Sequence, residues 1–136
     1  MKTSDSTTPT VGLFGCFSAA SNTGSLTAMA CLQVTKRLGS DVVGICSLPA
    51  LLNHVPRQSS LVKRLPHVLV VDGCNRSCAR ELLAGVHVTA DAYLNLEADL
   101  GIHKLGPFTS HEFDDEQLEA VTRAIAAAVE ALAAVG

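Results

Sequence analysis

One segment of the chain, His67–Asp72 (HVLVVD), limits the possible folds more than any other. Its four consecutive apolar residues lie between a proline, Pro66, and a glycine, Gly73. A short, uninterrupted apolar run of this kind is typical of a strand that is buried on both faces. Strands covered on both faces occur mainly in parallel sheets, so the segment predicts a sheet with helices on either side.

Strand-like and helical segments alternate on both sides of this run. Val11–Cys16 is a short apolar run, and it precedes a small, polar turn and a helical stretch from about Leu26 to Leu38. A second β-branched run covers Asp41–Cys46, and one or two strand-like segments lie within residues 86–96. Parallel neighbours require crossover connections, so this alternation predicts an α/β fold, a three-layer sandwich with a mostly parallel, Rossmann-like sheet.

The remaining segments are predicted to be helical or irregular. We expect helical turns at residues 47–53 and 96–100, and a loop at residues 54–60 (HVPRQSS). The stretch NRSCARELLAG contains good helix formers and ends at Gly85, a typical helix stop. The last helix is expected to begin after Asp114, a capping residue that has Gln117 three positions later, and to continue to Val135.

Size and composition indicate one globular domain. The 136 residues are 48% hydrophobic and 17% charged, which suits a core that needs no metal or disulfide. Residues 1–10 are polar and are expected to be flexible, with a single domain over residues 11–136. The formal net charge of -3 provides no basic field for nucleic acid. Secretory signals and apolar runs of roughly 18 residues are missing, which predicts a cytoplasmic protein with no membrane partner.

The five cysteines are the main clue to function. Lasting disulfides are not expected in a reducing cytoplasm, so several cysteines in one small domain indicate metal binding or thiol chemistry. Cys16, Cys46 and Cys74 come at the ends of predicted strands, and Cys78 falls in the first turn of the next helix. Carboxyl ends of parallel strands share one edge of a sheet, so these four thiols are predicted to meet there. Cys31 lies inside a helical pattern and is expected to pack against the sheet.

Four thiolates match the tetrahedral shell that zinc prefers. We therefore predict a bound zinc ion, with the ligands Cys16, Cys46, Cys74 and Cys78. Amide groups at helix N-termini and nearby cations would help to keep the thiolates ionised, the candidate cations being Arg76, Arg80 and Lys104. Asp72 and Ser77 are candidates for orienting the ligands. A saturated shell leaves no position for an activated water, so metal storage, transfer or sensing is favoured over hydrolysis.

Other functions are open to the same residues. The segment Cys74–Arg80 has the Cys-x5-Arg spacing of cysteine phosphatases and arsenate reductases, in which loop amides and an arginine hold an oxyanion near a thiolate. Against this, the loop contains no glycine to relieve a tight anion cradle. Cys74 and Cys78 could instead exchange disulfides in redox chemistry or sulfur transfer. Thiolates also bind copper(I) and iron–sulfur clusters, so the ligand type does not identify the metal.

The stretch His67–Leu105 resembles the DGC-domain family, small proteins named after a central Asp-Gly-Cys motif and proposed to bind zinc. The motif here is Asp72-Gly73-Cys74, and the likeness extends over residues 11–106. Four further features match the family's order of motifs, namely Cys16, Thr23-Gly24, Cys46 and Cys78. Residues 101–104 (GIHK) are similar to the family's Gly-Ile-Lys-rich segment. The resemblance implies a zinc site on the matching cysteines, and Cys31 is not part of the family pattern.

Overall fold

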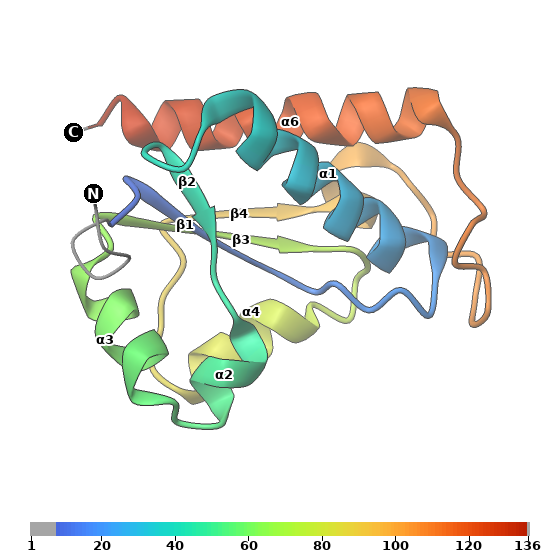
Figure 1. Ribbon diagram of the computed structural model, residues 1–136. Helices are drawn as coiled ribbons and strands as arrows, with labels where there is room; N and C mark the ends of the chain where they lie inside the picture. Colours follow the sequence, from blue (N-terminus) through green and yellow to red (C-terminus); the bar gives the residue numbers. More distant parts are fainter. Residues whose placement is uncertain (1–7, 136) are drawn as a thin grey trace.

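Four parallel strands form the central sheet in the computed structural model, which describes residues 8–135 (Figure 1). The strands are β1 (Val11–Gly15), β2 (Val43–Ile45), β3 (His67–Asp72) and β4 (Ala92–Asn95). They pair in the order β2-β1-β3-β4, and every neighbouring pair is parallel. The central pair is in register from Val11 opposite His67 to Gly15 opposite Val71. The predicted parallel sheet is confirmed, with a single strand in the region of residues 86–96.

Helices cover both faces of this sheet, which confirms the predicted three-layer α/β sandwich (Figure 1). One face carries α1 (Asn22–Leu38) and α6 (Asp115–Ala133), which lie side by side. The other face carries α2 (Leu48–Leu52), α3 (Pro56–Arg64) and α4 (Cys78–Gly85). A short helix, α5 (Leu96–Leu100), follows β4.

Alternate residues of each strand serve two separate cores. Leu13 of β1 and Leu69 of β3 belong to the core beneath α1 and α6, whereas Phe14 and Val70 belong to the core beneath α2, α3 and α4. This division follows from the two-residue period of a strand. Each side chain of this size contributes about 1.5–3 kcal/mol when it is fully buried. The sheet is therefore held from both sides, and its carboxyl edge is left for other contacts.

Two predictions about the helices are confirmed at the level of single residues. Cys31 of α1 is fully buried against the sheet, and this burial raises the pKa of its thiol to about 12. At the start of α6, the Asp114 carboxylate accepts a hydrogen bond from the backbone N–H of Gln117 at 2.7 Å. The Gln117 side chain accepts one from the backbone N–H of Asp114 at 3.2 Å, completing a capping box.

One helix, α3, replaces the loop that the sequence predicted at residues 54–60. Pro56 occupies its first position, where the missing N–H is not needed and the fixed φ suits a helix. Leu61 and Val62 pack, partly buried, against the second core. Pro56 and the polar residues after it favoured a loop in the sequence. The packing of Leu61 and Val62 against the core stabilises a helix there instead.

The first turn of α1 packs backbone to backbone against two loops. It begins at Asn22, ahead of the predicted start near Leu26, because the Asn22 side chain bonds the backbone of residues 103 and 105. A Cβ on Gly24 would overlap the carbonyl oxygen of Ser18, and a Cβ on Gly73 would lie 2.8 Å from the carbonyl oxygen of Thr23. These two glycines allow the loop after β1, the start of α1 and the turn after β3 to approach each other closely.

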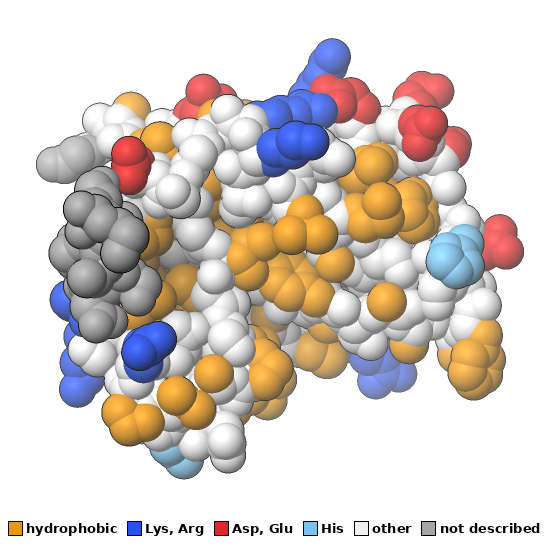
Figure 2. Space-filling model, in the orientation of Figure 1, with side chains coloured by type: hydrophobic (Ala, Val, Ile, Leu, Met, Phe, Trp, Pro, Cys, Tyr) orange, Lys and Arg blue, Asp and Glu red, His pale blue; other side chains and the backbone are white. Residues whose placement is uncertain are grey.

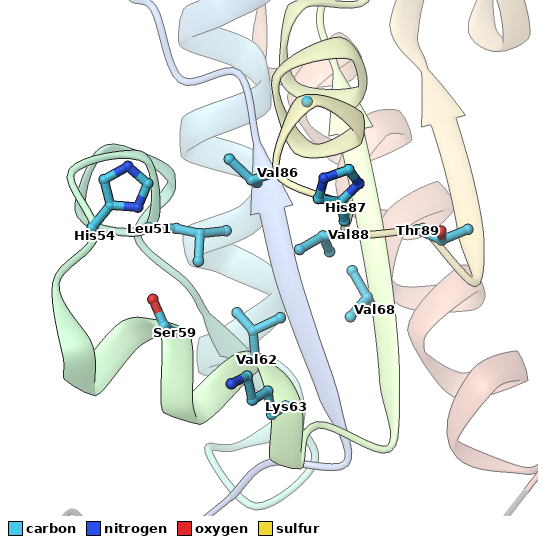
Figure 3. Close-up of a pocket in the computed structure, with 11 residues that line it drawn as sticks. Leu51, His54, Ser59, Val62, Lys63, Val68, Val86, His87, Val88 and Thr89 are labelled. Carbon is cyan, nitrogen blue, oxygen red and sulfur yellow. The ribbon is translucent and has the colours of Figure 1, made fainter.

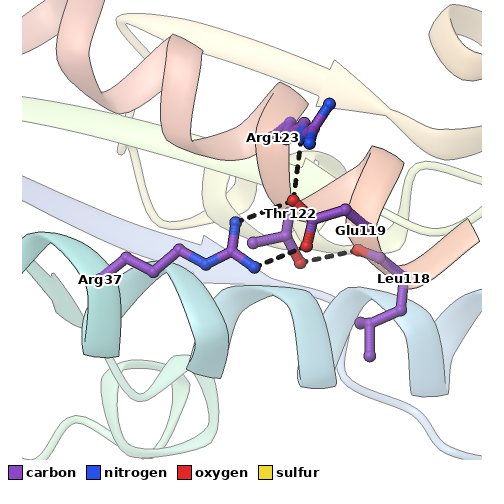
Figure 4. Close-up of polar contacts among 5 residues, drawn as sticks. All are labelled: Arg37, Leu118, Glu119, Thr122 and Arg123. Atoms are coloured by element: carbon purple, nitrogen blue, oxygen red, sulfur yellow. Dashed lines mark hydrogen bonds and ion pairs between the residues drawn. The ribbon is translucent and has the colours of Figure 1, made fainter. Parts of the chain in front are cut away.

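Surface ion pairs join α1 to α6. Glu119 of α6 accepts hydrogen bonds from Arg37 of α1 at 2.6 Å and from Arg123 at 2.9 Å (Figure 4). Hydrogen bonds from Arg37 and Arg123, together with the charges of these two arginines, lower the pKa of Glu119 from 4.5 to about 2. Because all three side chains are exposed, solvent screens the pairs and keeps their contribution to stability small.

Apolar side chains also reach the surface. Figure 2 shows them spread over the face that carries α1, while charged side chains gather along α6. The exposed large ones on this part of the fold include Met29 and Leu32 of α1 and Ile45 of β2. Exposed apolar residues of this kind are common on folded proteins and by themselves indicate no binding partner.

Two expectations concern the chain as a whole. Across residues 8–135, none of the helices combines the length and the apolar character that crossing a lipid bilayer requires. The flexible terminus expected at residues 1–10 falls mainly on residues 1–7, which lie outside the described residues. Thr10, which is described, donates its backbone N–H to the carbonyl of Asp41 at 3.2 Å.

We expect Gly24→Ala to lower the free energy of unfolding by about 1–3 kcal/mol, because the added methyl group must displace the backbone of Ser18. Urea denaturation would measure the change. Gly85→Ala is the matched control, since a Cβ there meets nothing within 4 Å and the residue ends a helix. It should leave stability unchanged or raise it slightly. Equal midpoints for the two variants would contradict the close packing of α1.

The Glu119 ion pairs predict a pH-dependent difference between wild type and Glu119→Gln. The folded-state pKa is below the ordinary value of 4.5, so the stabilisation is fully present above pH 4.5 and is lost as the pH falls towards about 2. At pH 6 the thermal midpoint of the wild type should be slightly higher than that of Glu119→Gln, and this difference should disappear at pH 2. Glu130→Gln, near the other end of α6, is the control. A difference that stays constant with pH would rule out this assignment.

Candidate functional site

The carboxyl ends of β1 and β3 lie at the centre of the sheet, where the strand order changes direction. After β1 the chain crosses on the face of α1, and after β3 it crosses on the face of α4. Crossovers that leave on opposite faces open a crevice, which is where open α/β sheets bind ligands. The backbone N–H of Cys16 donates to the carbonyl of Val71 at 3.1 Å, so the pairing of β1 and β3 continues up to this cysteine.

A hollow of about 220 Å³ lies at this edge of the sheet. We call it the thiol pocket, because three cysteines from different elements line it: Cys16 after β1, Cys74 after β3 and Cys78 at the start of α4. Its wall also contains the first residues of α1 and two basic side chains, Arg76 and Lys104. The structure therefore brings together three of the four predicted zinc ligands and two of the three predicted cations.

The three thiols differ in exposure and share one electrostatic environment. Cys16 and Cys74 are partly buried, whereas Cys78 is exposed. Burial is the main cause that raises the pKa of Cys16, and the charges of Asp72, Cys78 and Cys74 raise it further. A hydrogen bond from the backbone of Ser18 acts in the opposite direction. Cys16 is therefore a neutral thiol at pH 7, and binding a cation there would release its proton.

Cys46 lies apart from this pocket. It is 4% exposed and belongs to the core beneath α2, α3 and α4, where burial raises the pKa of its thiol to about 11. Its Sγ lies 3.9 Å from the carbonyl oxygen of Gly44 and 3.2 Å from the position that a Cβ on Gly12 would take. Gly12 precedes Cys16 on β1 by four residues, which is about 13 Å along a strand. The Cys46 sulfur thus faces the middle of the sheet.

The donor chemistry of the thiol pocket suits a soft or borderline cation, because thiolates are the ligands that such metals prefer. The geometry is less complete. Within residues 8–135, no group of three histidine, cysteine or acidic side chains converges closely enough to hold a metal ion. Metal binding would therefore require side-chain movement, and exposed Cys78 is the ligand with the most freedom to move.

Asp72, from the Asp-Gly-Cys motif, positions the pocket by capping α4. Its buried carboxylate accepts hydrogen bonds from the backbone N–H groups of Ala79 at 2.9 Å and Arg80 at 3.1 Å. It accepts a third, from the Tyr93 hydroxyl of β4, at 2.9 Å. The carboxylate thereby fixes the start of α4, and with it Cys78, relative to the end of β3.

Arg80 is engaged away from the thiols. Its guanidinium lies 4.2 Å from the centre of the Tyr93 ring and donates to the Ser77 hydroxyl at 3.5 Å. A Cys-x5-Arg site needs the arginine and the first helical amides to face a bound oxyanion. Here the arginine stacks on Tyr93, and the Asp72 carboxylate occupies the amides of Ala79 and Arg80. Both contacts weigh against an oxyanion cradle around Cys74.

Two residues that the sequence reasoning missed hold the turn of the motif. Asn95 donates its side-chain amide to the carbonyl of Cys74 at 2.8 Å. Glu97 accepts hydrogen bonds from the backbone N–H of Asn75 at 2.9 Å and of Lys104 at 3.0 Å, and these bonds lower its pKa. Asn95 ends a strand at the same edge as the cysteines, a signal that could have found it. No sequence pattern indicated Glu97.

Comparison with known proteins supports the resemblance drawn from the motifs. A family model, described as the DGC domain, matches residues 12–125 and so covers most of the chain and every cysteine. No curated protein and no solved structure gives a match. The match extends beyond the cysteines into α6, the helix that packs beside α1. This chain therefore belongs to the DGC-domain family.

Proposed function

We propose that this chain binds zinc reversibly in the thiol pocket and serves metal storage, transfer or sensing. The supporting observation is that Cys16, Cys74 and Cys78 come from three separate elements and line one hollow. This hollow lies at the switch point of the sheet, the place between β1 and β3 where the strand order changes direction. Each of these thiols taken alone would be ordinary, since single free cysteines often act as small apolar residues. Three at one ligand-binding edge favour a shared role.

Positive charge on the pocket wall would stabilise thiolates once a bound cation has displaced their protons. Arg76 and Lys104 line the pocket, and so does the N-terminal turn of α1. The first turn of this helix contains no acidic residue, and the side chain of its N-cap, Ser21, makes no capping hydrogen bond. The Asn22 N–H donates to the Thr109 hydroxyl at 3.1 Å, but no acidic side chain of the first turn offsets the positive end of the helix dipole, which lies at the pocket. These groups offset part of the repulsion between thiolates and the Asp72 carboxylate.

Reversible binding is favoured over a permanent structural zinc. The chain builds two apolar cores from its own side chains, so its folding does not depend on a metal. A site whose ligands must first move together binds more weakly than a site that is already assembled. Such a site exchanges its ion more readily, which suits a protein that receives and passes on metal.

The proposed shell has Cys16, Cys74 and Cys78 as its first three ligands. Cys46, the fourth ligand predicted from the sequence, would have to leave its buried position to join them. Until it does, the fourth coordination position is open to a donor or acceptor molecule. An open position of this kind allows a metal to pass between proteins by ligand exchange.

Zinc titration of the reduced full-length protein tests this proposal. With a chromophoric chelator as competitor, we expect about one zinc per chain and three thiols protected from a thiol reagent. Cys16→Ala, Cys74→Ala and Cys78→Ala should each weaken zinc binding by more than about tenfold. The loss of a residue that only hydrogen-bonds to a metal ligand already costs about that much affinity. Cys31→Ala is the matched control, because Cys31 is a cysteine in the apolar core.

Two results would contradict the zinc proposal. One is a loss of affinity in Cys31→Ala as large as in the three pocket variants. The other is aryl phosphate hydrolysis by the metal-free protein that disappears in Arg80→Ala, which would favour a cysteine phosphatase. We expect Arg80→Ala to keep its zinc, because Arg80 contacts Tyr93 and Ser77 rather than the thiols.

Cys46→Ala separates a shell of three cysteines from one of four. We expect this variant to bind one zinc with an affinity within about threefold of the wild type, a change well below the tenfold that a lost ligand causes. Its unfolding free energy should fall, because a buried side chain is truncated. Calorimetric titration and urea denaturation on one sample give both values. A loss of zinc as severe as in Cys74→Ala would instead indicate the four-cysteine shell predicted from the sequence.

A further inference from the structure

A second hollow, of about 710 Å³, lies on the face of the sheet that carries α2, α3 and α4. It is bounded by α3 on one side and by the connection between α4 and β4 on the other (Figure 3). Val68, the second residue of β3, also lines it, so the hollow lies towards the amino end of this strand, whereas the thiol pocket lies at the carboxyl end. We call it the apolar pocket.

Five of the eleven residues that line the apolar pocket have branched aliphatic side chains. Leu51 and Val68 are buried, whereas Val62, Val86 and Val88 are only partly covered (Figure 3). The partial exposure arises because α3 packs mainly on α2 and leaves a gap towards the end of α4. An apolar body placed in this gap would remove further surface of the three valines from water.

The polar side chains of this hollow include three that carry or can carry positive charge. They are His54, Lys63 and His87, all exposed, and among residues 8–135 no acidic side chain lines the pocket. His54 and His87 come from the two sides of the hollow, one after α2 and the other after α4 (Figure 3). Ammonium and imidazole N–H groups are hydrogen-bond donors that suit a carboxylate.

The backbone at both histidines is unusual. Each follows the C-cap of a helix and adopts a left-handed conformation, with φ of 57° at His54 and 62° at His87. Glycine is the usual residue at this position, because it carries no Cβ. Strained residues of this type cluster at ligand sites. Here the ends of two helices, α2 and α4, each carry a histidine at the position where glycine is usual. Both imidazoles line the same hollow.

We propose that the apolar pocket binds a small carboxylate with an apolar body, of the size of a medium-chain fatty acid. The chain would lie against Val62, Val86 and Val88, and the carboxylate would lie at the rim beside Lys63, with His54 and His87 at other places on the same rim (Figure 3). The volume falls within the range of about 300–1,000 Å³ that is typical of small-molecule sites. This site shares no residue with the thiol pocket, so the proposal stands independently of zinc binding.

The test is calorimetric titration of the full chain with decanoate, below its micelle concentration, and with 1-decanol as the neutral analogue. We expect saturable binding of decanoate, and decanol at least about tenfold weaker, because the alcohol lacks the charge that the rim recognises. Lys63→Glu should weaken decanoate binding by about tenfold or more. Lys36→Glu is the matched control, an exposed lysine on α1 that lines neither pocket and should leave binding unchanged.

A second variant locates the bound molecule. Ser59 lines the hollow from α3, and Ser59→Trp should fill it and abolish decanoate binding while the thermal midpoint stays close to that of the wild type. The proposal would be overturned by any of four results: no saturable binding of decanoate, equal binding of decanol, equal effects of Lys63→Glu and Lys36→Glu, or unchanged binding in a folded Ser59→Trp protein.

Discussion

The buried carboxylate of Asp72 is the interaction on which the arrangement of the thiol pocket depends. It joins three elements, because it ends β3, caps α4 through two backbone N–H groups and accepts the hydroxyl of Tyr93 from β4. A buried carboxylate is stable only when its oxygens receive hydrogen bonds. The three hydrogen bonds therefore hold the Asp72 carboxylate in place, and they also hold α4 and Tyr93 against it. Cys74 and Cys78 lie on the turn that the network encloses.

Close backbone packing completes the pocket on its other side. Gly24 and Gly73 let the start of α1 contact the loop after β1 and the turn after β3, which brings the N-terminus of a long helix to the thiols. The combination explains how one edge can tolerate several thiols and a carboxylate. The first turn of α1 and two basic side chains, Arg76 and Lys104, surround these groups.

The two pockets differ in their place in the fold and in the chemistry of their lining residues. The thiol pocket is small, lies at the carboxyl ends of the strands and combines sulfur donors with cations. The apolar pocket is larger, lies towards the amino ends of the strands and combines valines with a basic rim. The difference follows from the fold, because the switch point concentrates chain ends at one edge, whereas a short helix, α3, leaves aliphatic side chains half covered at the other.

The sequence by itself determined the sheet, most helices and the placing of Cys16, Cys74 and Cys78 at one edge. Hydrophobic periodicity is a local property of the chain, and strands joined by helical crossovers run parallel, so their carboxyl ends share one edge. Only the tertiary structure decided that Cys46 turns into a core, that Arg80 stacks on Tyr93 and that residues 56–64 form a helix. Those outcomes depend on which side chains from distant segments compete for the same space. A sequence pattern gives the strand on which a thiol lies, but packing decides which way its sulfur points.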